Sequence, residues 1–352
     1  GRPGHEQLQA VKGTAMKNPR VAVMALLGLA CLAMNVASAT EKVTVDNFVR
    51  AETDTTFKRY VAQGAFGKFL HIRNMTPIDK QDVIRMNRDT LYSAGVFDLT
   101  TPVTIVKPDP GKRFQSMLVI NQDHSMLPVE HGAGRFTLTH EKVGTRYAIV
   151  LLRTFADPND PADMKAANAL QDRVQTEQAS IGTFEVPAWD EASLHTVRNA
   201  LNVLAATKTD ASGMFGDKAK LNPIDHLLGA AYGWGGNPKD AAVYQNGVPS
   251  NNDGKAAYVL TARDVPVDGF WSITVYNAKG FMELNDRNAY SVNNVTAKRN
   301  AYGSVTVHFG GDPAAANYLP ITPGWSYVVR MYRPRKTVVD GMWKFPEAQP
   351  VR

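Results

Sequence analysis

The hydrophobic pattern divides the chain into two strand-rich regions with a helical region between them. In both strand-rich regions, short apolar segments are separated by turn residues, which is typical of antiparallel sheets. We predict strands in the first region at 92–99, 103–107, 114–122, 135–141 and 146–155. Strands of the second region are predicted at 255–261, 269–277, 302–311 and 325–334.

Helical periodicity is found before the first strands and again between the two strand-rich regions. Phe48, Val49, Phe57 and Tyr60 fall near helical spacing, and Asp46 precedes them as a candidate N-cap. The segment 160–232 contains three further helix starts, with Asp160, Asp190 and Asn222 as N-caps and Pro161 and Pro223 at first helical positions.

The order of these elements predicts a mainly β fold with helical insertions (α+β). We expect two antiparallel β-sandwich or jelly-roll-like domains joined by a helical segment. The expected parts are an N-terminal β domain at 40–158, a helical linker or cover at 159–235 and a C-terminal β domain at 236–352. The sequence does not fix the oligomeric state, although exposed edge strands would suit a homodimer.

The beginning of the chain has the pattern of a targeting segment. Met16, Lys17 and Arg20 precede an apolar stretch that ends at Ala37-Ser38-Ala39, a small-x-small cleavage pattern. We therefore expect a signal peptide at about 16–39, cleaved after Ala39, and a periplasmic or secreted protein with no stable membrane span. Residues 1–15 lack this character, so 1–39 are excluded from the predicted fold.

The cysteine content and the charge distribution exclude some kinds of chemistry and some partners. Cys31 is the only cysteine, and cleavage would remove it, which excludes disulfides and cysteine nucleophiles from the mature chain. The net charge is +6, but basic and acidic residues are interspersed and form no basic stripe. We therefore expect no nucleic-acid partner.

Two inward-facing arginines stand out in otherwise apolar strands. Arg153 shares a face with Leu151, so its charge is directed toward the core and needs a partner. The carboxylate of Asp157 or Asp160 would suffice as this partner. Arg330 shares a face with Val328 and Tyr332, and it is the strongest single candidate for an anion-binding arginine.

The segments "NRDTLYS", "LNPIDHLLGAAYGWGGNP", "GFWSITVYNAKGF", "YSVNN" and "LPITPGWSYVVRMYRPRKTVVDGMWKFP" resemble a bacterial family of two domains of unknown function. These are the domain of unknown function 1254 on the N-terminal side and 1214 on the C-terminal side. The resemblance covers most of residues 45–350. It implies two β-sandwich or jelly-roll-like domains in an exported protein, and it implies no particular reaction.

The polar segment 85–93 is the first candidate site. Arg85, Asn87 and Arg88 could bind a carboxylate or phosphate, while Asp89 and Tyr92 are the candidate catalytic residues for proton transfer. The alternative is a structural Arg–Asp pair that holds a turn. In the second region, the candidate substrate-binding residues are Trp271, Tyr276, Asn293, Arg330 and Tyr332.

Histidines and carboxylates near residue 124 raise the question of a metal. His124, Glu130 and His131 are the alternative ligands for a divalent metal, but neither H-E-x-x-H nor H-x-H spacing is present. A polar loop explains the same residues, so we predict no cofactor.

Three functions are compatible with these observations. The first is a hydrolase or lyase for a small polar or anionic substrate bound between two β domains. The second is a non-catalytic envelope protein that binds a ligand or a protein. The third is a carbohydrate-active or carbohydrate-binding protein, suggested by the five tryptophans and twelve tyrosines. The sequence leaves open whether the protein is an enzyme.

Overall fold

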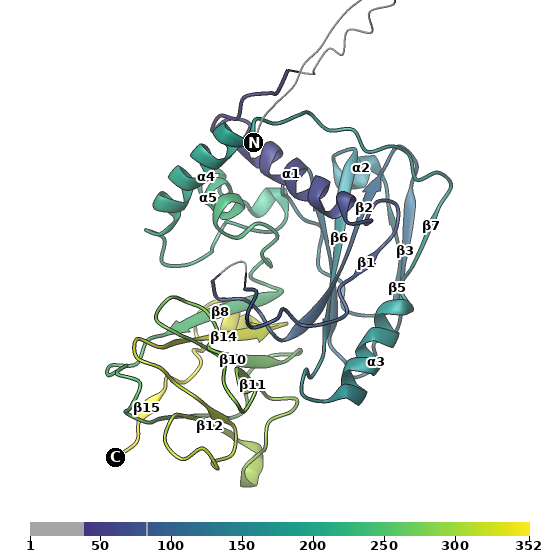
Figure 1. Cartoon of the computed structure of the whole chain (residues 1–352). Helices are drawn as coiled ribbons and strands as arrows, with labels where there is room; N and C mark the ends of the chain where they lie inside the picture. Colours follow the sequence, from purple (N-terminus) through teal and green to yellow (C-terminus); the bar gives the residue numbers. More distant parts are fainter. Residues whose placement is uncertain (1–38, 82–83) are drawn as a thin grey trace, which may run out of the picture. The chain divides into compact units, whose positions relative to one another are not determined.

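The computed structural model describes residues 39–81 and 84–352 of the chain (Figure 1). The predicted signal peptide lies outside the described residues except for Ala39. None of the helices in the described part of the chain has the length and apolarity needed to cross a membrane.

Two antiparallel sheets form the N-terminal half. The first has the strand order β1-β2-β6-β4 and the second β5-β3-β7. Their bounds are β1 Leu70–His71, β2 Thr90–Asp98, β3 Val103–Lys107, β4 Gln115–Asn121, β5 Gly134–Leu138, β6 Tyr147–Phe155 and β7 Gln175–Gln178. Alternate residues of both sheets, including Phe97, Ile105 and Val150, pack into one apolar core between them.

Helices cover the other face of the first sheet. They are α1 (Phe48–Ala62), α4 (Glu191–Ala205) and α5 (Pro223–Gly233), which pack on one another and lie together in Figure 1. Phe57 of α1 contributes to an apolar cluster with Ile149 and Leu151 of β6. The remaining helices are α2 (His140–Val143), α3 (Pro161–Asp172), α6 (Lys336–Val339), η1 (Lys218–Lys220) and η2 (Ala301–Gly303).

The C-terminal half again contains two sheets, ordered β11-β10-β14-β8 and β13-β12-β9-β15. All pairs are antiparallel except β12 with β13. The bounds are β8 Ala242–Gly247, β9 Tyr258–Ala262, β10 Trp271–Tyr276, β11 Ser291–Asn293, β12 Val305–Phe309, β13 Tyr318–Leu319, β14 Ser326–Tyr332 and β15 Gln349–Pro350. Trp325, Val307 and Phe309 are buried in the core between these sheets.

The structure confirms the α+β fold of two sheet-rich domains joined by a helical segment. Asp160, Asp190 and Asn222 cap α3, α4 and α5 as expected. Asp160 and Asn222 each accept two backbone N–H groups of the first turn, and Asp190 accepts one. The predicted cap at Asp46 is wrong. Helix α1 begins after Asn47, one residue later, and the Asn47 side chain makes no capping bond.

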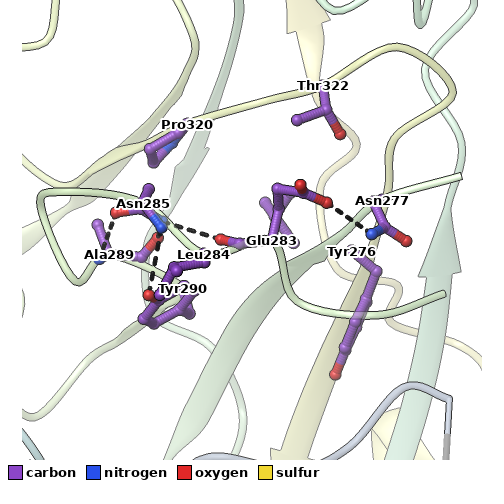
Figure 2. A pocket seen from close by; sticks show the side chains of 10 residues that line it. Tyr276, Asn277, Glu283, Leu284, Asn285, Ala289, Tyr290, Pro320 and Thr322 are labelled. Atoms are coloured by element: carbon purple, nitrogen blue, oxygen red, sulfur yellow. Dashed lines mark hydrogen bonds between the residues drawn. The ribbon is translucent and has the colours of Figure 1, made fainter. Parts of the chain in front are cut away.

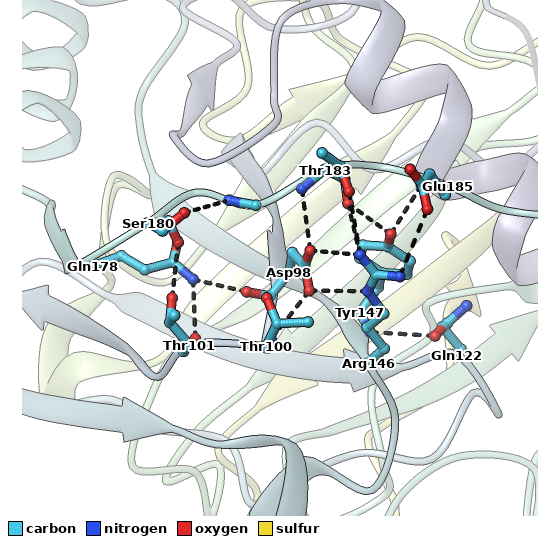
Figure 3. A network of polar contacts seen from close by, with 11 residues as sticks. Asp98, Thr100, Thr101, Gln122, Arg146, Tyr147, Gln178, Ser180, Thr183 and Glu185 are labelled. Atoms are coloured by element: carbon cyan, nitrogen blue, oxygen red, sulfur yellow. Dashed lines mark hydrogen bonds and ion pairs between the residues drawn. The ribbon is translucent and has the colours of Figure 1, made fainter.

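A buried carboxylate at the end of β2 fixes the segment that follows β7. Asp98 accepts hydrogen bonds from the Arg146 guanidinium at 2.9 and 3.1 Å and from the backbone N–H of Thr183 at 3.1 Å (Figure 3). The Tyr147 hydroxyl donates to the Thr183 carbonyl at 2.6 Å. Gly182 is required here because its φ is +69° and a Cβ would lie 2.3 Å from Asp98 Oδ2.

These hydrogen bonds hold the pKa of Asp98 below its ordinary value of 3.8. Burial alone would raise the pKa, but the bonds from Arg146, Thr100 and Thr183 to the ionised form outweigh burial. The ionised carboxylate therefore stabilises the fold above pH 3.8, and this contribution is lost as the pH falls through the lower folded-state pKa.

We predict that Asp98→Ala lowers the free energy of unfolding by about 2 kcal/mol at pH 7, because buried N–H donors lose their acceptor. Urea unfolding at several pH values measures this. The difference between the variant and the wild type should shrink below about pH 4.

A matched control is Glu177→Ala, which removes the exposed ion pair between Arg135 and Glu177 on the neighbouring sheet. This change should have little effect on stability. A loss at Asp98→Ala no larger than at Glu177→Ala would contradict the proposed role of Asp98.

Candidate functional site

Strand β14 presents two different faces to its surroundings. Tyr327, Val329 and Met331 point into the C-terminal core. Arg330 and Tyr332 point to the opposite side and are 4% and 1% exposed. Period-two alternation therefore places a guanidinium and a phenol on the outer face of this sheet, where the segment 85–89 covers them.

Strand β10 pairs with β14 and has the same alternation. Ile273 lies in the core, whereas Ser272, Thr274 and Tyr276 share the outer face with Arg330. All three of these polar residues are fully buried. The two strands together form a polar surface that faces the N-terminal half of the chain.

Asp89 meets this surface from the start of β2 and is 2% exposed. Its carboxylate accepts hydrogen bonds from Ser272 Oγ at 2.6 Å, Tyr332 OH at 3.0 Å and Ser291 Oγ at 3.4 Å. Burial, followed by the charge of Asp89, raises the pKa of Tyr332 well above its usual range. Tyr332 therefore stays protonated and donates to Asp89.

Asn87 completes the arrangement around Asp89. Its side-chain amide donates to Tyr332 OH, and its Oδ1 accepts the backbone N–H of Asp89 at 2.7 Å. Tyr332, predicted for ligand binding, thus contacts the predicted catalytic carboxylate, whereas Asn87 contacts Tyr332 and the backbone of Asp89. Whether Asp89 transfers protons stays a prediction.

Arg330 bonds protein oxygens on both sides of the interface. It donates to the Arg85 carbonyl and to Tyr276 OH, both at 2.8 Å, and to Thr274 Oγ1 at 3.2 Å. Tyr276 in turn donates to the Met86 carbonyl at 2.7 Å. No described carboxylate forms an ion pair with Arg330, but the charge of Asp89 acts on it through the same cluster.

The other two predicted arginines have different surroundings. Arg85 is exposed, has a φ of 53°, and contributes its carbonyl rather than its guanidinium to the Arg330 cluster. Arg88 donates to the Thr76 carbonyl at 3.0 Å, and its guanidinium carbon lies 5.2 Å from the centre of the Tyr290 ring. Neither guanidinium bonds Asp89 among the described contacts.

A small hollow of about 90 Å³ adjoins this cluster (Figure 2). Tyr276 and Tyr290 line it together with Glu283 and Asn285. Tyr276 directs its hydroxyl away from the other labelled side chains, toward the Arg330 side. Asn285 bonds the backbone of Ala289 and Glu283, so its amide serves the local turn.

The second inward arginine, Arg153 on β6, is 7% exposed. It donates to Asn237 Oδ1 at 3.0 Å and to the Gly235 carbonyl at 2.9 Å. The expected partners Asp157 and Asp160 are wrong, because their carboxylates bond backbone N–H groups at the start of the α3 region instead. Among described residues, Arg153 has only neutral hydrogen-bond partners.

Tyrosines surround Arg153. Its guanidinium carbon lies 5.5 Å from the centre of the Tyr92 ring, and the phenols of Tyr92, Tyr244 and Tyr332 act on its charge. Tyr244 on β8 is 45% exposed, and its hydroxyl accepts a hydrogen bond from the Asn237 amide at 3.2 Å. We call Arg153, Asn237, Tyr60, Tyr92 and Tyr244 the Arg153 site, since Arg153 also acts on Tyr60.

Two hydrogen bonds hold the segment after α5 beside this site. Trp234 Nε1 donates to Thr53 Oγ1 at 3.0 Å, and the Gly235 backbone N–H donates to His124 Nε2 at 2.9 Å. Burial, and then the nearby His226, lowers the pKa of His124 to about 3. The neutral imidazole can therefore accept this bond at physiological pH.

The alternative metal ligands serve other contacts. His124 is fully buried in the cluster just described, and Glu130 pairs with Met117 through its backbone. His131 lies against Phe114, and its carbonyl accepts a hydrogen bond from Lys107. Within the described residues, no group of three histidine, cysteine or acidic side chains is arranged to hold a metal.

The two remaining candidates lie in local structure. Trp271 is buried in the C-terminal core with its ring edge against Phe345. Asn293 Oδ1 accepts the backbone N–H groups of Val295 and Thr296, as in an asparagine-stabilised turn. Their roles in ligand binding stay predictions.

Sequence reasoning did not select Tyr60, Asn237 or Tyr244 for a site. One signal was present, namely an arginine on the core-directed face of an apolar strand. The partners could not be inferred, because Asn237 lies 84 positions after Arg153.

The fold and the buried interface define a class of two-domain α+β proteins whose halves join through polar side chains. Two family models match in the expected order, Protein of unknown function DUF1254 over residues 66–178 and Protein of unknown function DUF1214 over residues 241–336. The chain belongs to the family that combines these two domains.

The chain is similar to two solved structures, and the first of them supports this fold. The VPA0106 protein from Vibrio parahaemolyticus has a TM-score of 0.64 at 17% identity, over 88% of this chain and all of that one. A putative uncharacterized protein from Burkholderia cenocepacia has a TM-score of 0.49 at 14% identity, over 88% of this chain and 87% of that one. A comparison with curated proteins gives no match.

We predict that Asp89 and Arg330 stabilise the interface as a coupled pair. Asp89→Asn should lower the free energy of unfolding by about 3 kcal/mol, because it leaves Arg330 buried without a nearby negative charge. Urea unfolding of Asp89→Asn, Arg330→Met and the double variant measures the coupling. The double variant should lose clearly less than the sum of the two single losses; additive losses would contradict the pairing.

Proposed function

We propose that this is an exported protein that binds a small polar anion at the Arg153 site. The observation that carries the proposal is a buried guanidinium whose described hydrogen-bond partners are all neutral. The site lies where β6 of the N-terminal half approaches the segment that leads into β8 of the C-terminal half.

The physical argument is the cost of burying a charge. Removing an ion from water costs several kcal/mol unless an opposite charge and hydrogen bonds compensate for it. Amide and carbonyl oxygens compensate only in part. A ligand carboxylate that replaced Asn237 Oδ1 would supply the missing charge, and the guanidinium fork matches its geometry.

The two buried arginines differ in this respect. The charge of Asp89 acts on Arg330 within one hydrogen-bonded cluster, and three protein oxygens occupy its donors. Arg153 has no such neighbour among the groups that act on it. This contrast favours Arg153 over Arg330 as the anion-binding residue.

Binding is favoured over catalysis because Asp89 is enclosed by three hydroxyl donors and is almost fully buried. One observation supports an enzyme as the second candidate. The Tyr92 ring lies against the Arg153 guanidinium, so a bound anion would meet a phenol that can donate a proton. Turnover of a bound anion that is lost in Tyr92→Phe would support this alternative.

Export is part of the proposal and is supported by the sequence. A charged start, an apolar stretch and Ala37-Ser38-Ala39 form the pattern of a cleaved signal, and the chain has no cysteine after Cys31. N-terminal sequencing of the protein purified from its native host would test the expected cleavage after Ala39.

We predict that Asn237→Asp abolishes anion binding and raises the melting temperature by several degrees. The new carboxylate would pair with Arg153 in almost the same space as the amide, and so would act as a built-in ligand. Thermal unfolding with and without an excess of sodium acetate, at constant ionic strength, measures both effects.

Asn246→Asp is the matched control, since Asn246 is an exposed residue of β8 and the charge change is identical. This variant should keep both the wild-type melting temperature and the response to acetate. If Asn237→Asp responds to acetate as the wild type does, Arg153 does not bind the anion.

A further inference from the structure

We infer that the ligand is a monocarboxylate with an aromatic or branched apolar body, an inference that rests on the proposed anion site at Arg153. The positive charge of Arg153 lies on the same face of β6 as a surface that includes aromatic side chains, and an anion could compensate this charge.

The charge balance favours a monoanion. Arg153 supplies a single positive charge, and the groups that act on it are tyrosines rather than further lysines or arginines. A dianion such as a phosphate monoester would therefore retain an uncompensated charge in a partly buried place.

The hydrogen-bonding groups around Arg153 also favour an acceptor ligand. Burial raises the pKa of Tyr60, so this phenol stays protonated at neutral pH, whereas the Tyr332 phenol already donates to Asp89. The two oxygens nearest the guanidinium, on Asn237 and Gly235, already accept from Arg153. Donors thus exceed free acceptors at the site, as a carboxylate requires.

The apolar part of the ligand is indicated by the residues beside Arg153. Leu151 precedes it by two positions on the same face of β6, about 7 Å along the strand. Tyr60 and Trp234 pack in the same apolar cluster as Leu151. A carboxylate held by Arg153 would therefore place a body the size of a phenyl ring against aromatic and aliphatic side chains.

Four probes separate the contributions of charge and body. Phenylacetate has the expected charge and ring, acetate lacks the ring, phenylacetamide lacks the charge, and phenylphosphonate carries a second negative charge at high pH. Calorimetric titration of the wild type at pH 8.5 should show phenylacetate binding at least ten-fold more tightly than acetate and phenylphosphonate. Phenylacetamide should show no measurable binding.

Tyr60→Ala tests the contact with the body. The variant should bind phenylacetate at least ten-fold more weakly than the wild type does. Its affinity for acetate should stay within two-fold of the wild-type value. Asn246→Asp serves again as the control and should bind all four probes as the wild type does.

The outcomes distinguish this inference from the proposed function. If acetate, phenylacetate and phenylphosphonate bind equally and Asn237→Asp abolishes all three, the anion site stands and the ligand class is wrong. If phenylacetamide binds as tightly as phenylacetate, the carboxylate is not recognised and both proposals are wrong. Both are also wrong if none of the anions binds the wild type.

Discussion

The structure depends on how two buried charges, Asp89 and Arg330, are compensated across the boundary between its halves. They do not bond each other directly among the described contacts. Asp89 comes from the N-terminal half and bonds hydroxyls of the C-terminal sheet, whereas Arg330 comes from that sheet and bonds the Arg85 carbonyl. Each buried charge is compensated by groups from the other half, so removing one of the two side chains would leave the other charge buried and only partly compensated, at a cost of several kcal/mol. This mutual requirement links the folding of the two halves.

The charge of Arg153 is compensated less completely than the charge of Arg330 in that cluster. The same fold compensates one arginine with a carboxylate nearby and several oxygens, and leaves the other with an amide and a carbonyl. Partly compensated charges are costly, so a stability requirement alone would favour an acidic residue at position 237. Asparagine at this position fills the same space without the charge. That choice is explained if an anion from solution occupies the guanidinium during function.

Sequence reasoning succeeded where the determining contacts are local. Alternation with period two correctly placed Val328, Arg330 and Tyr332 on one face of β14, because the face of a strand depends only on its own residues. Helix caps at Asp160, Asp190 and Asn222 were predicted for the same reason. The partner of Arg153 was predicted wrongly, since the nearby Asp157 and Asp160 were considered but Asn237 was not. Tertiary packing brings Asn237 to Arg153, and no local pattern records it.

The hydrogen bond between His124 and Gly235, which positions one side of the Arg153 site, also determines how the site responds to pH. Gly235 is fixed by the neutral imidazole of His124, whose pKa is about 3 in the folded protein. The unfolded chain binds a proton there from about pH 6.5 downward, so acidification between pH 6.5 and 3 lowers stability. Within the folded molecule, however, the bond to Gly235 persists across that range, and Arg153 keeps its charge. Acidification from neutral pH to about pH 4 therefore leaves the bond to Gly235 and the charge of Arg153 unchanged, so the ligand's own acidity is the variable that affects binding through these groups.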